Sequence, residues 1–245
     1  MTVLLLGASN LARAHRALSR CLRRNLHPRP VRLLSALGPG RGYAARGGFW
    51  RLQFPPIQTS PVLAEACRAA RRGEQGVAFF TDIGNDLLYN VTGEQLVQVL
   101  ANMFEPLRRA GAEILVTPIH PVLTTILTPR RYRWLRAWLY SKSRVPFEQL
   151  IEGIEAVNRF LEQEEAAGRL RRVRGMEAFL GWDHVHYGFF RASRAWTLAA
   201  ESILRALNRP CRRPIGVMDL GGAYWDYALR LAGALVFPSK CESGF

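Results

Sequence analysis

The chain has 245 residues, which is enough for one α/β domain whose core is stable without cross-links. Its four cysteines form no CxxC pair and are widely spaced, which argues against a disulfide framework or a zinc site: Cys21, Cys67, Cys211 and Cys241. No apolar run reaches the roughly 18 residues of a membrane span, and no signal-peptide pattern precedes the first apolar run. We therefore expect a cytoplasmic protein.

The formal net charge is +15, from 34 basic and 19 acidic residues. Such a charge is typical of proteins that bind nucleic acid, anionic membranes or acidic substrates. However, Lys142 and Lys240 are the only lysines, and the arginines are spread over every predicted helix. We interpret most of this charge as solvated helix surface and disfavour nucleic acid as a partner.

Short apolar runs alternate with helical segments along the chain. Buried parallel strands are predicted at residues 3–6, 31–36, 77–81 and 114–118, with a weaker fifth at 170–173. Helices are predicted at residues 11–24, 61–72, 92–110, 147–167 and 189–208. This alternation predicts a doubly wound, five-stranded parallel sheet in a three-layer α/β/α domain. Reactive groups in such sheets lie at the carboxyl ends of the strands.

Two segments exceed this pattern. Residues 120–146 follow the fourth strand and interleave apolar, aromatic and arginine side chains, and residues 214–245 contain an apolar helical stripe. We assign residues 1–213 to one domain, with 120–146 as an insertion, and residues 214–245 to a C-terminal extension. This extension would pack either on the same domain or on a partner in a homodimer.

The turn after the first strand reads Gly-Ala-Ser-Asn and suits either a dinucleotide site or a serine nucleophile. A dinucleotide fold needs further small residues and an acidic residue after the second strand. Here Asn10 and Arg13 occupy positions where a dinucleotide-binding turn needs small residues, and no acidic residue follows the second strand. We therefore favour a nucleophile, Ser9, at the head of a helix whose dipole stabilises negative charge, with a helix N-cap as its alternative role.

A serine nucleophile needs a base, a group that orients the base, and donors for the oxyanion. The predicted topology brings candidates to one edge of the sheet, after the second and third strands and before the last helix: Gly38, Gly40, Gly42, Asn85, Asp183 and His186. A metal site made of Asp183, His184 and His186 competes with this interpretation. Because the chain offers no HExxH motif and no second ligand cluster, we expect no metal and no cofactor.

In chain order, these groups resemble the four blocks of the SGNH, or GDSL-type, hydrolases: Gly7-Ala8-Ser9, a glycine after the second strand, Gly84-Asn85-Asp86 and Asp183-x-x-His186. The resemblance runs from residue 3 to about residue 205. It implies a flavodoxin-like α/β fold. It also implies an ester or thioester hydrolase, of the carboxylesterase, acetylesterase or lipase type, that works through an acyl-enzyme without a cofactor; acyl transfer uses the same parts.

The chain departs from this family at two places. The first block usually reads Gly-Asp-Ser-Leu, so the carboxylate and the apolar anchor beside the nucleophile are missing here. In the third block, Ile83 stands where the family usually has glycine. Both changes leave the reacting groups intact and bear on the shape of the acyl pocket.

The resemblance also assigns roles to the residues. Ser9 is the nucleophile, His186 takes its proton and returns it to the leaving group, and Asp183 orients the imidazole. The backbone N–H groups of Ser9 and Gly40 and the Asn85 amide would form the oxyanion hole. Gly40 is preferred to Gly38 because the stretch that follows it resembles the Gly-Arg-Ser stretch of some carbohydrate acetylesterases, and Asp86 is expected to hold its loop.

Substrate contacts are expected from side chains near these blocks and in the insertion: Asn10, Arg41, Trp134, Trp138 and His184. The aromatic residues of the insertion would either roof an apolar acyl site or serve as core packing or a dimer face: Tyr132, Trp134, Trp138 and Tyr140. Arginines on that roof would favour an anionic substrate, such as a phosphate-bearing or acidic-sugar ester: Arg130, Arg131, Arg133 and Arg136. The substrate is otherwise expected to be a small-molecule, lipid or carbohydrate ester.

Two non-enzymatic interpretations remain alternatives. A basic α/β module would bind RNA or single-stranded nucleic acid through arginine and aromatic side chains. A peripheral membrane protein would dock through residues 120–146 and the apolar stripe at 223–236. Neither explains why serine, asparagine, aspartate and histidine fall at matching strand ends.

Overall fold

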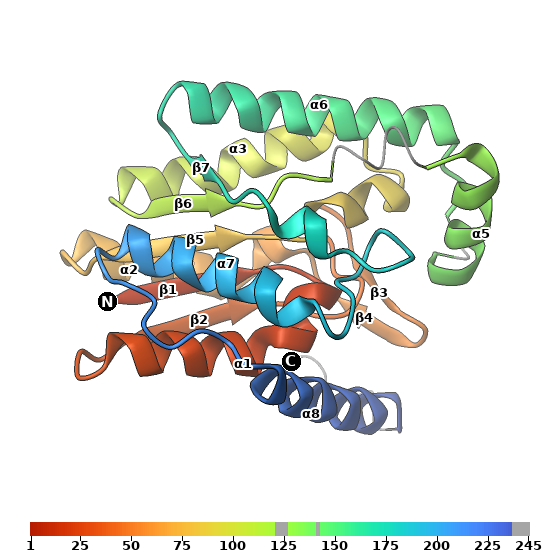
Figure 1. Cartoon of the computed structure of the whole chain (residues 1–245). Helices are drawn as coiled ribbons and strands as arrows, with labels where there is room; N and C mark the ends of the chain where they lie inside the picture. The colour runs from red at the N-terminus through yellow and green to blue at the C-terminus, as the bar shows by residue number, and fades with distance from the viewer. Residues whose placement is uncertain (121–126, 141–142, 237–245) are drawn as a thin grey trace.

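A computed structural model describes residues 1–120, 127–140 and 143–236, and Cys241 lies outside these ranges. Five parallel strands form the central sheet: β1 (Thr2–Leu6), β2 (Arg32–Ala36), β5 (Gly76–Phe80), β6 (Glu113–Val116) and β7 (Arg171–Arg172). Their spatial order is β2-β1-β5-β6-β7 (Figure 1). Numbered within this sheet alone, this is the flavodoxin-like order 2-1-3-4-5. The predicted doubly wound parallel sheet is confirmed.

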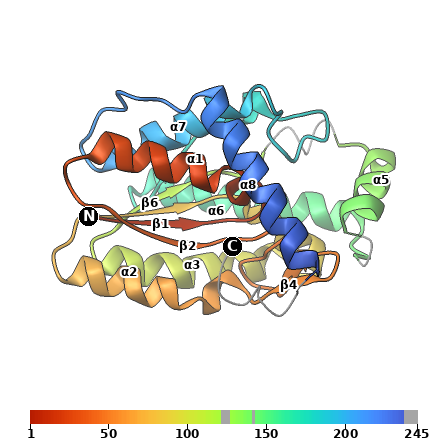
Figure 2. The same cartoon turned by 90° about the horizontal axis from the view of Figure 1, so that it is seen from below.

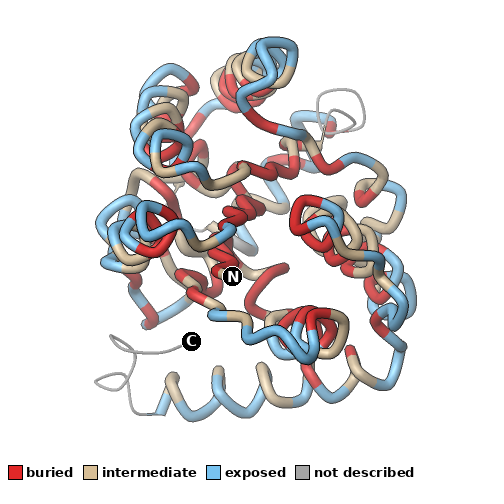
Figure 3. Tube along the Cα trace, turned by 90° about the vertical axis from the view of Figure 1, so that its left-hand side faces the viewer, coloured by how far each residue is buried: buried red, intermediate tan, exposed pale blue. Residues whose placement is uncertain are grey.

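Helices cover both faces of the sheet, as Figures 1 and 2 show. One face packs against α1 (Ser9–Leu26), α7 (Ala192–Ala206) and α8 (Val217–Val236). The other packs against α2 (Pro61–Arg71), α3 (Gly93–Arg109) and α6 (Phe147–Ala166). Alternate side chains of β1 enter the two cores, because successive residues of a strand point to opposite faces. The buried residues lie on the strands and on the inward sides of the helices (Figure 3).

The boundaries of the predicted elements agree with the structure to within about three residues. Thr92, the first residue of the helix predicted at 92–110, is the N-cap of α3: its hydroxyl accepts a hydrogen bond from the Gln95 backbone at 3.3 Å, and the Gln95 side chain accepts one from the Thr92 backbone at 2.9 Å. Helix α7 begins at Ala192 instead of residue 189, because residues 188–191 form a turn closed by a hydrogen bond from Arg191 N to Gly188 O.

Several short elements have no counterpart in the predictions. The antiparallel pair β3 (Gly47–Phe49) and β4 (Leu52–Phe54) is too short and too glycine-rich to give an alternating pattern. Three 3₁₀ helices, η1 (Ile57–Thr59), η2 (Ile83–Tyr89) and η3 (Met176–Phe179), occupy connections. The insertion contains α5 (Pro129–Leu139), which stands at the end of the molecule toward which the strands run (Figure 1).

The C-terminal extension forms α8, which crosses α1 (Figure 2). Leu220 and Ala223 are buried in the core on that side, and Asp226 pairs with Arg16 at 3.2 Å. The opposite side of α8 exposes Trp225 among other apolar residues. None of the helices in the described part of the chain is long and apolar enough to cross a membrane.

Candidate active site

The carboxyl ends of β1 and β5 and the segment before α7 bring the predicted reactive groups to one edge of the sheet. Ser9 is the first residue of α1, two residues beyond Gly7 at the end of β1, and Asn85 lies in η2 after β5. Asp183 and His186 lie between η3 and α7. Groups separated by up to 177 residues therefore meet at this edge.

The three residues expected to react are joined by hydrogen bonds. Ser9 Oγ lies 3.0 Å from His186 Nε2, and His186 Nδ1 lies 2.7 Å from Asp183 Oδ2. The other oxygen of Asp183 accepts the backbone N–H groups of Val185 and His186 at 3.1 and 2.9 Å. Burial acts to raise the pKa of Asp183, but the hydrogen bonds from His186 outweigh it and hold that pKa below its ordinary value. The carboxylate is therefore ionised at neutral pH and can stabilise an imidazolium.

Ser9 does not serve as a helix cap. The N-cap position of α1 is occupied by Ala8, and the Ser9 hydroxyl pairs with His186 instead of with a backbone N–H. Ser9 is the first residue of α1, so its hydroxyl lies at the N-terminal end of the helix dipole. The alternative role of this serine as an N-cap is wrong.

The structure supplies the carboxylate that the first block lacks, from a different segment. Asp82 follows β5, and its carboxylate accepts the backbone N–H groups of Ala8 and Leu11 at 2.9 and 3.2 Å. It also accepts the side-chain amide of Asn10 at 2.9 Å. Asp82 was not among the predicted site residues, and its signal in the sequence is an aspartate directly beyond a buried strand. Asp82 anchors the turn that holds Ser9.

Asn10 lines the cavity beside Ser9 and is also engaged in hydrogen bonds within the protein. Its Nδ2 donates to Asp82 and, at 2.9 Å, to the backbone oxygen of Val185, while its Oδ1 accepts the backbone N–H of Tyr187 at 3.2 Å. These contacts use both donors of the amide. Asn10 therefore ties the serine turn to the segment that contains His186, and because it also lines the cavity, its substrate contact stays a prediction.

We expect Asp82→Asn to lower both stability and turnover. The new amide would place its own N–H group against N–H groups that now donate to the carboxylate. We expect this to lower the free energy of unfolding by about 1–3 kcal/mol. Displacement of the Ser9 turn should reduce kcat by about 10- to 100-fold. Asp226→Asn, which changes an exposed pair on α8, is the matched control. Wild-type unfolding and kcat in Asp82→Asn would contradict the anchoring role.

The Asn85 amide is held in a defined orientation beside Ser9. Its Oδ1 accepts the Tyr140 hydroxyl at 2.6 Å, and its Nδ2 donates to the backbone oxygen of Arg41 at 3.2 Å. Burial raises the pKa of the Tyr140 phenol well above its ordinary value, so the phenol remains a donor. Because an amide has two N–H donors, one is left to bind an oxyanion in the cavity that Ser9 and Asn85 both line.

Asn85→Ala is expected to reduce kcat by about 10²- to 10³-fold with little change in KM, because an oxyanion donor acts mainly in the transition state. Tyr140→Phe keeps the ring but removes the donor that orients Asn85, so we expect a smaller loss of kcat. Steady-state kinetics on a nitrophenyl ester measure both effects. Asn90→Ala, at the end of η2, provides a control, and an equal effect of both asparagine variants would argue against the oxyanion role.

Gly40 precedes Arg41, whose backbone oxygen accepts the Asn85 amide, but Gly40 itself does not line the cavity. It occupies the third position of a turn in which Arg41 N donates to Gly38 O at 3.1 Å, with φ at +67°. A Cβ there would come within 2.2 Å of Gly48 O, so only glycine fits. The Gly40 carbonyl accepts the Tyr89 hydroxyl at 2.6 Å. Its role as an oxyanion donor stays a prediction.

Arg41 does not contact the cavity, contrary to expectation. Its guanidinium donates to the backbone oxygens of Pro55 at 3.0 Å and Leu37 at 3.4 Å, because the side chain folds back onto its own loop. The predicted substrate role of Arg41 is therefore corrected to a structural one.

Asp86 ties the loop after β2 to the loop after β5. It is fully buried and accepts the backbone N–H groups of Tyr43, Ala44 and Ala45 at 2.6–2.8 Å. Burial raises its pKa, while these hydrogen bonds act in the opposite direction. The arrangement agrees with its expected role in holding the loop, and it sets the spacing between the glycine turn and Asn85.

A cavity of about 170 Å³ opens beside Ser9 and extends under η2, α5 and α6. Its walls are mainly apolar and include Ile83, Leu88, Ile119, Leu135, Leu150 and Ile154. His184, which was expected to contact substrate, also lines it. The size and lining suit an aliphatic group whose carbonyl carbon reaches Ser9.

Only some of the aromatic and arginine side chains that were expected to roof this cavity line it. Tyr132 and Tyr140 line the cavity, but Trp134 and Trp138 do not, because they are exposed on the outer side of α5. Their predicted substrate contact is corrected. Of the four arginines, only Arg136 lines the cavity, and its guanidinium donates to Val145 O at 3.0 Å. The roof is therefore largely apolar.

Fold and site together define an α/β protein of flavodoxin-like strand order with a hydrogen-bonded Ser-His-Asp group at the carboxyl edge of its sheet. Within the described ranges, no cluster of three or more His, Cys, Asp or Glu is arranged to hold a metal ion. No family model matches the chain, and no curated protein matches it.

Several solved structures match most of the chain, and they include lipolytic proteins. TesA is 19% identical over 84% of this chain and 99% of its own, with a TM-score of 0.48. A G-D-S-L family protein of Veillonella parvula is 11% identical over 85% and 99%, with a TM-score of 0.43. The esterase EstA of a Pseudoalteromonas species is 14% identical over 84% and 98%, with a TM-score of 0.47. At this level of similarity, the geometry of the site carries the functional proposal.

Proposed function

We propose that the chain is a serine hydrolase of the SGNH, or GDSL, type that cleaves a carboxylic ester or thioester through an acyl-enzyme. The observation that carries this proposal is the hydrogen-bonded series from Ser9 Oγ through the His186 imidazole to Asp183. Such a series supplies a nucleophile, a base and a group that orients the base.

In the first half of the proposed reaction, Ser9 Oγ attacks the carbonyl carbon while His186 Nε2 accepts the serine proton. The carbonyl oxygen becomes an oxyanion, stabilised by the Asn85 amide and the Ser9 backbone N–H at the positive end of α1. The C–O or C–S bond to the leaving group then breaks as His186 returns the proton to it. The alcohol or thiol departs, and the acyl group stays on Ser9.

In the second half, a water molecule attacks the acyl carbon and gives a proton to His186 Nε2. The second tetrahedral intermediate collapses, His186 protonates Ser9 Oγ, and the carboxylic acid is released. Asp183 keeps the imidazole in the tautomer whose Nε2 is unprotonated before each attack. An alcohol in place of water would give acyl transfer by the same steps.

The acyl group is proposed to occupy the apolar cavity. Its lining is mainly apolar and offers many hydrocarbon contacts, which supports an aliphatic acyl chain. The alcohol part of the substrate is not constrained by this cavity. No specific contact supports the alternative of a nucleic-acid binding module.

A fluorophosphonate probe and a panel of nitrophenyl esters of increasing acyl length test the proposal. We expect covalent labelling of the peptide that contains Ser9, and turnover that rises with acyl length until the cavity is filled. Prior treatment with the probe should abolish turnover. Labelling of another serine, or no labelling and no turnover of any ester, would reject the proposed function.

A further inference from the structure

Three exposed tryptophans form one cluster at the surface. Trp134 and Trp138 lie on α5, and Trp182 directly precedes Asp183. Their ring centroids are 5.6, 5.9 and 6.1 Å apart. The three residues remain 54%, 55% and 68% exposed. We call this set the tryptophan cluster.

The tryptophan cluster lies on two segments that also form part of the wall of the acyl cavity. On α5, Leu135 and Arg136 lie between Trp134 and Trp138 and line the cavity. On the other side, Leu180 and His184 flank Trp182 and line it too. Both segments that hold the cluster therefore also form the cavity wall.

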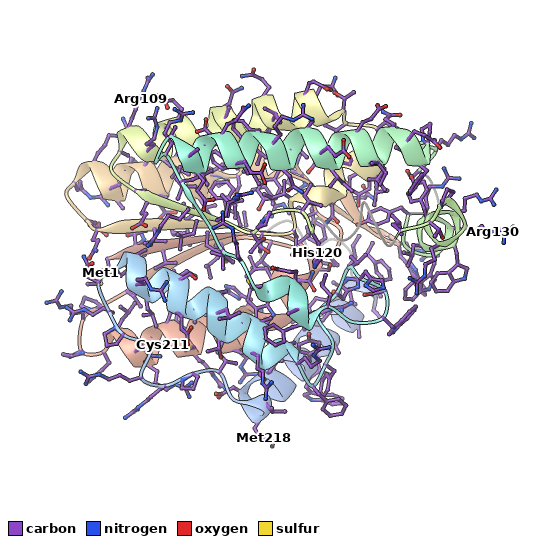
Figure 4. All side chains as sticks on the ribbon, turned by 45° about the horizontal axis from the view of Figure 1, so that its top comes forward. Met1, Arg109, His120, Arg130, Cys211 and Met218 are labelled. Carbon is purple, nitrogen blue, oxygen red and sulfur yellow. The ribbon has the colours of Figure 1, made fainter. Side chains whose placement is uncertain are left out.

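The surface around the cluster is strongly basic. Helix α5 contains four arginines and no acidic residue, and Arg130, Arg131 and Arg133 are exposed. Arg130 lies at the opposite end of the molecule from Met1 and Cys211 (Figure 4). Helix α8, which also exposes apolar side chains, contains two acidic residues, Asp219 and Asp226, and one arginine, Arg230.

We propose that the tryptophan cluster and the exposed arginines of α5 dock on an anionic phospholipid surface. Tryptophan favours the boundary between hydrocarbon and water, and arginine is attracted to anionic headgroups. This chemistry fits better than a second copy of the chain, since a twofold contact through α5 would bring two sets of arginines together. Docking there would hold the segments that wall the acyl cavity against lipid, and the value of this for an ester substrate rests on the proposed function.

Binding to vesicles tests the docking without reference to catalysis. The full chain carrying Ser9→Ala is sedimented with vesicles of phosphatidylcholine alone and of phosphatidylcholine with 30 mol% phosphatidylglycerol. We expect binding to the anionic vesicles, a blue shift of tryptophan fluorescence, and weakening by salt. Trp134→Ala with Trp138→Ala should reduce the partition coefficient by at least about tenfold. Trp225→Ala, an exposed tryptophan on α8, is the matched control.

The charge contribution is tested by Arg130→Gln, Arg131→Gln and Arg133→Gln together. Each basic residue near an anionic membrane adds enough attraction that we expect a loss of at least about tenfold in partition coefficient. The control removes three exposed arginines from α1, α2 and α7: Arg20→Gln, Arg68→Gln and Arg205→Gln. Both triple variants have the same net charge, so a general charge effect would weaken both equally.

Any of three results would overturn the proposal. They are equal losses in the two triple variants, binding that depends on Trp225 and not on Trp134 and Trp138, and no binding to anionic vesicles. A change of oligomeric state in the Trp134→Ala, Trp138→Ala variant without vesicle binding would instead identify a contact between copies of the chain, and would also overturn it. Vesicle binding by a chain that hydrolyses no ester would leave the docking intact and reject the proposed function.

Discussion

Ser9→Ala should lower ester turnover by at least about 10⁴-fold, and His186→Ala by a similar factor. The two side chains act as one unit at 3.0 Å, so the double variant should be no less active than either single variant. Rates with a nitrophenyl ester measure this, and labelling by a fluorophosphonate should be lost in both single variants.

Ser202→Ala is the control for these measurements. Its hydroxyl donates to the Leu198 backbone oxygen within α7, and the residue does not line the cavity, so activity and labelling should match those of the wild type. A lost nucleophile should leave a residual rate far below about a hundredth of the wild-type rate. If Ser9→Ala kept its labelling and a rate above that level, another residue would have to be the nucleophile.

Asp183→Asn is expected to lower kcat by about 10³- to 10⁴-fold while leaving the fold intact. The new amide would donate to His186 Nδ1 and force the proton onto Nε2, which then cannot accept the Ser9 proton. Steady-state kinetics measure kcat, and circular dichroism checks the fold. Asp226→Asn, on α8, should retain wild-type kcat.

The same substitution tests the pH dependence of stability. The pKa of Asp183 lies below its ordinary value in the folded protein, so the ionised carboxylate stabilises the fold above the unfolded-state pKa. That contribution is lost as the pH falls through the folded-state pKa. Urea unfolding should therefore show a smaller loss of stability on acidification in Asp183→Asn than in the wild type. Identical acid profiles would contradict the assigned hydrogen bonds.

The main elements, and the meeting of the candidate site residues at one edge of the sheet, could be predicted from the sequence, whereas the roles of Ser9, His186 and Asp183 came from a family resemblance. Buried strands leave continuous apolar runs in the sequence. Because parallel strands bring their carboxyl ends to one edge of the sheet, Ser9 and Asn85 could be assigned to one site from the sequence alone. The weak strand β7 contains only Arg171 and Arg172, and it lies within the predicted fifth strand at residues 170–173.

The residues that sequence reasoning missed or misplaced depend on contacts between distant segments. Asp82 acts through N–H groups of a turn more than 70 residues earlier, so no spacing rule indicated it. Trp134 and Trp138 have the same apolar character as Tyr132, and only the rotation of α5 decides which side chains face the cavity. The length of the Arg41 side chain allowed it to fold back on its own loop.

One stretch of chain performs two tasks that are often separate. Tyr132 and Leu135 shape the space for the acyl group, and Tyr140 orients the amide that would receive the oxyanion. A change of length or composition in this stretch would therefore alter the choice of acyl chain and the rate of reaction together. A change in this stretch that alters the preferred acyl chain would therefore also alter the rate of reaction, unless Asn85 gained a different hydrogen-bond partner.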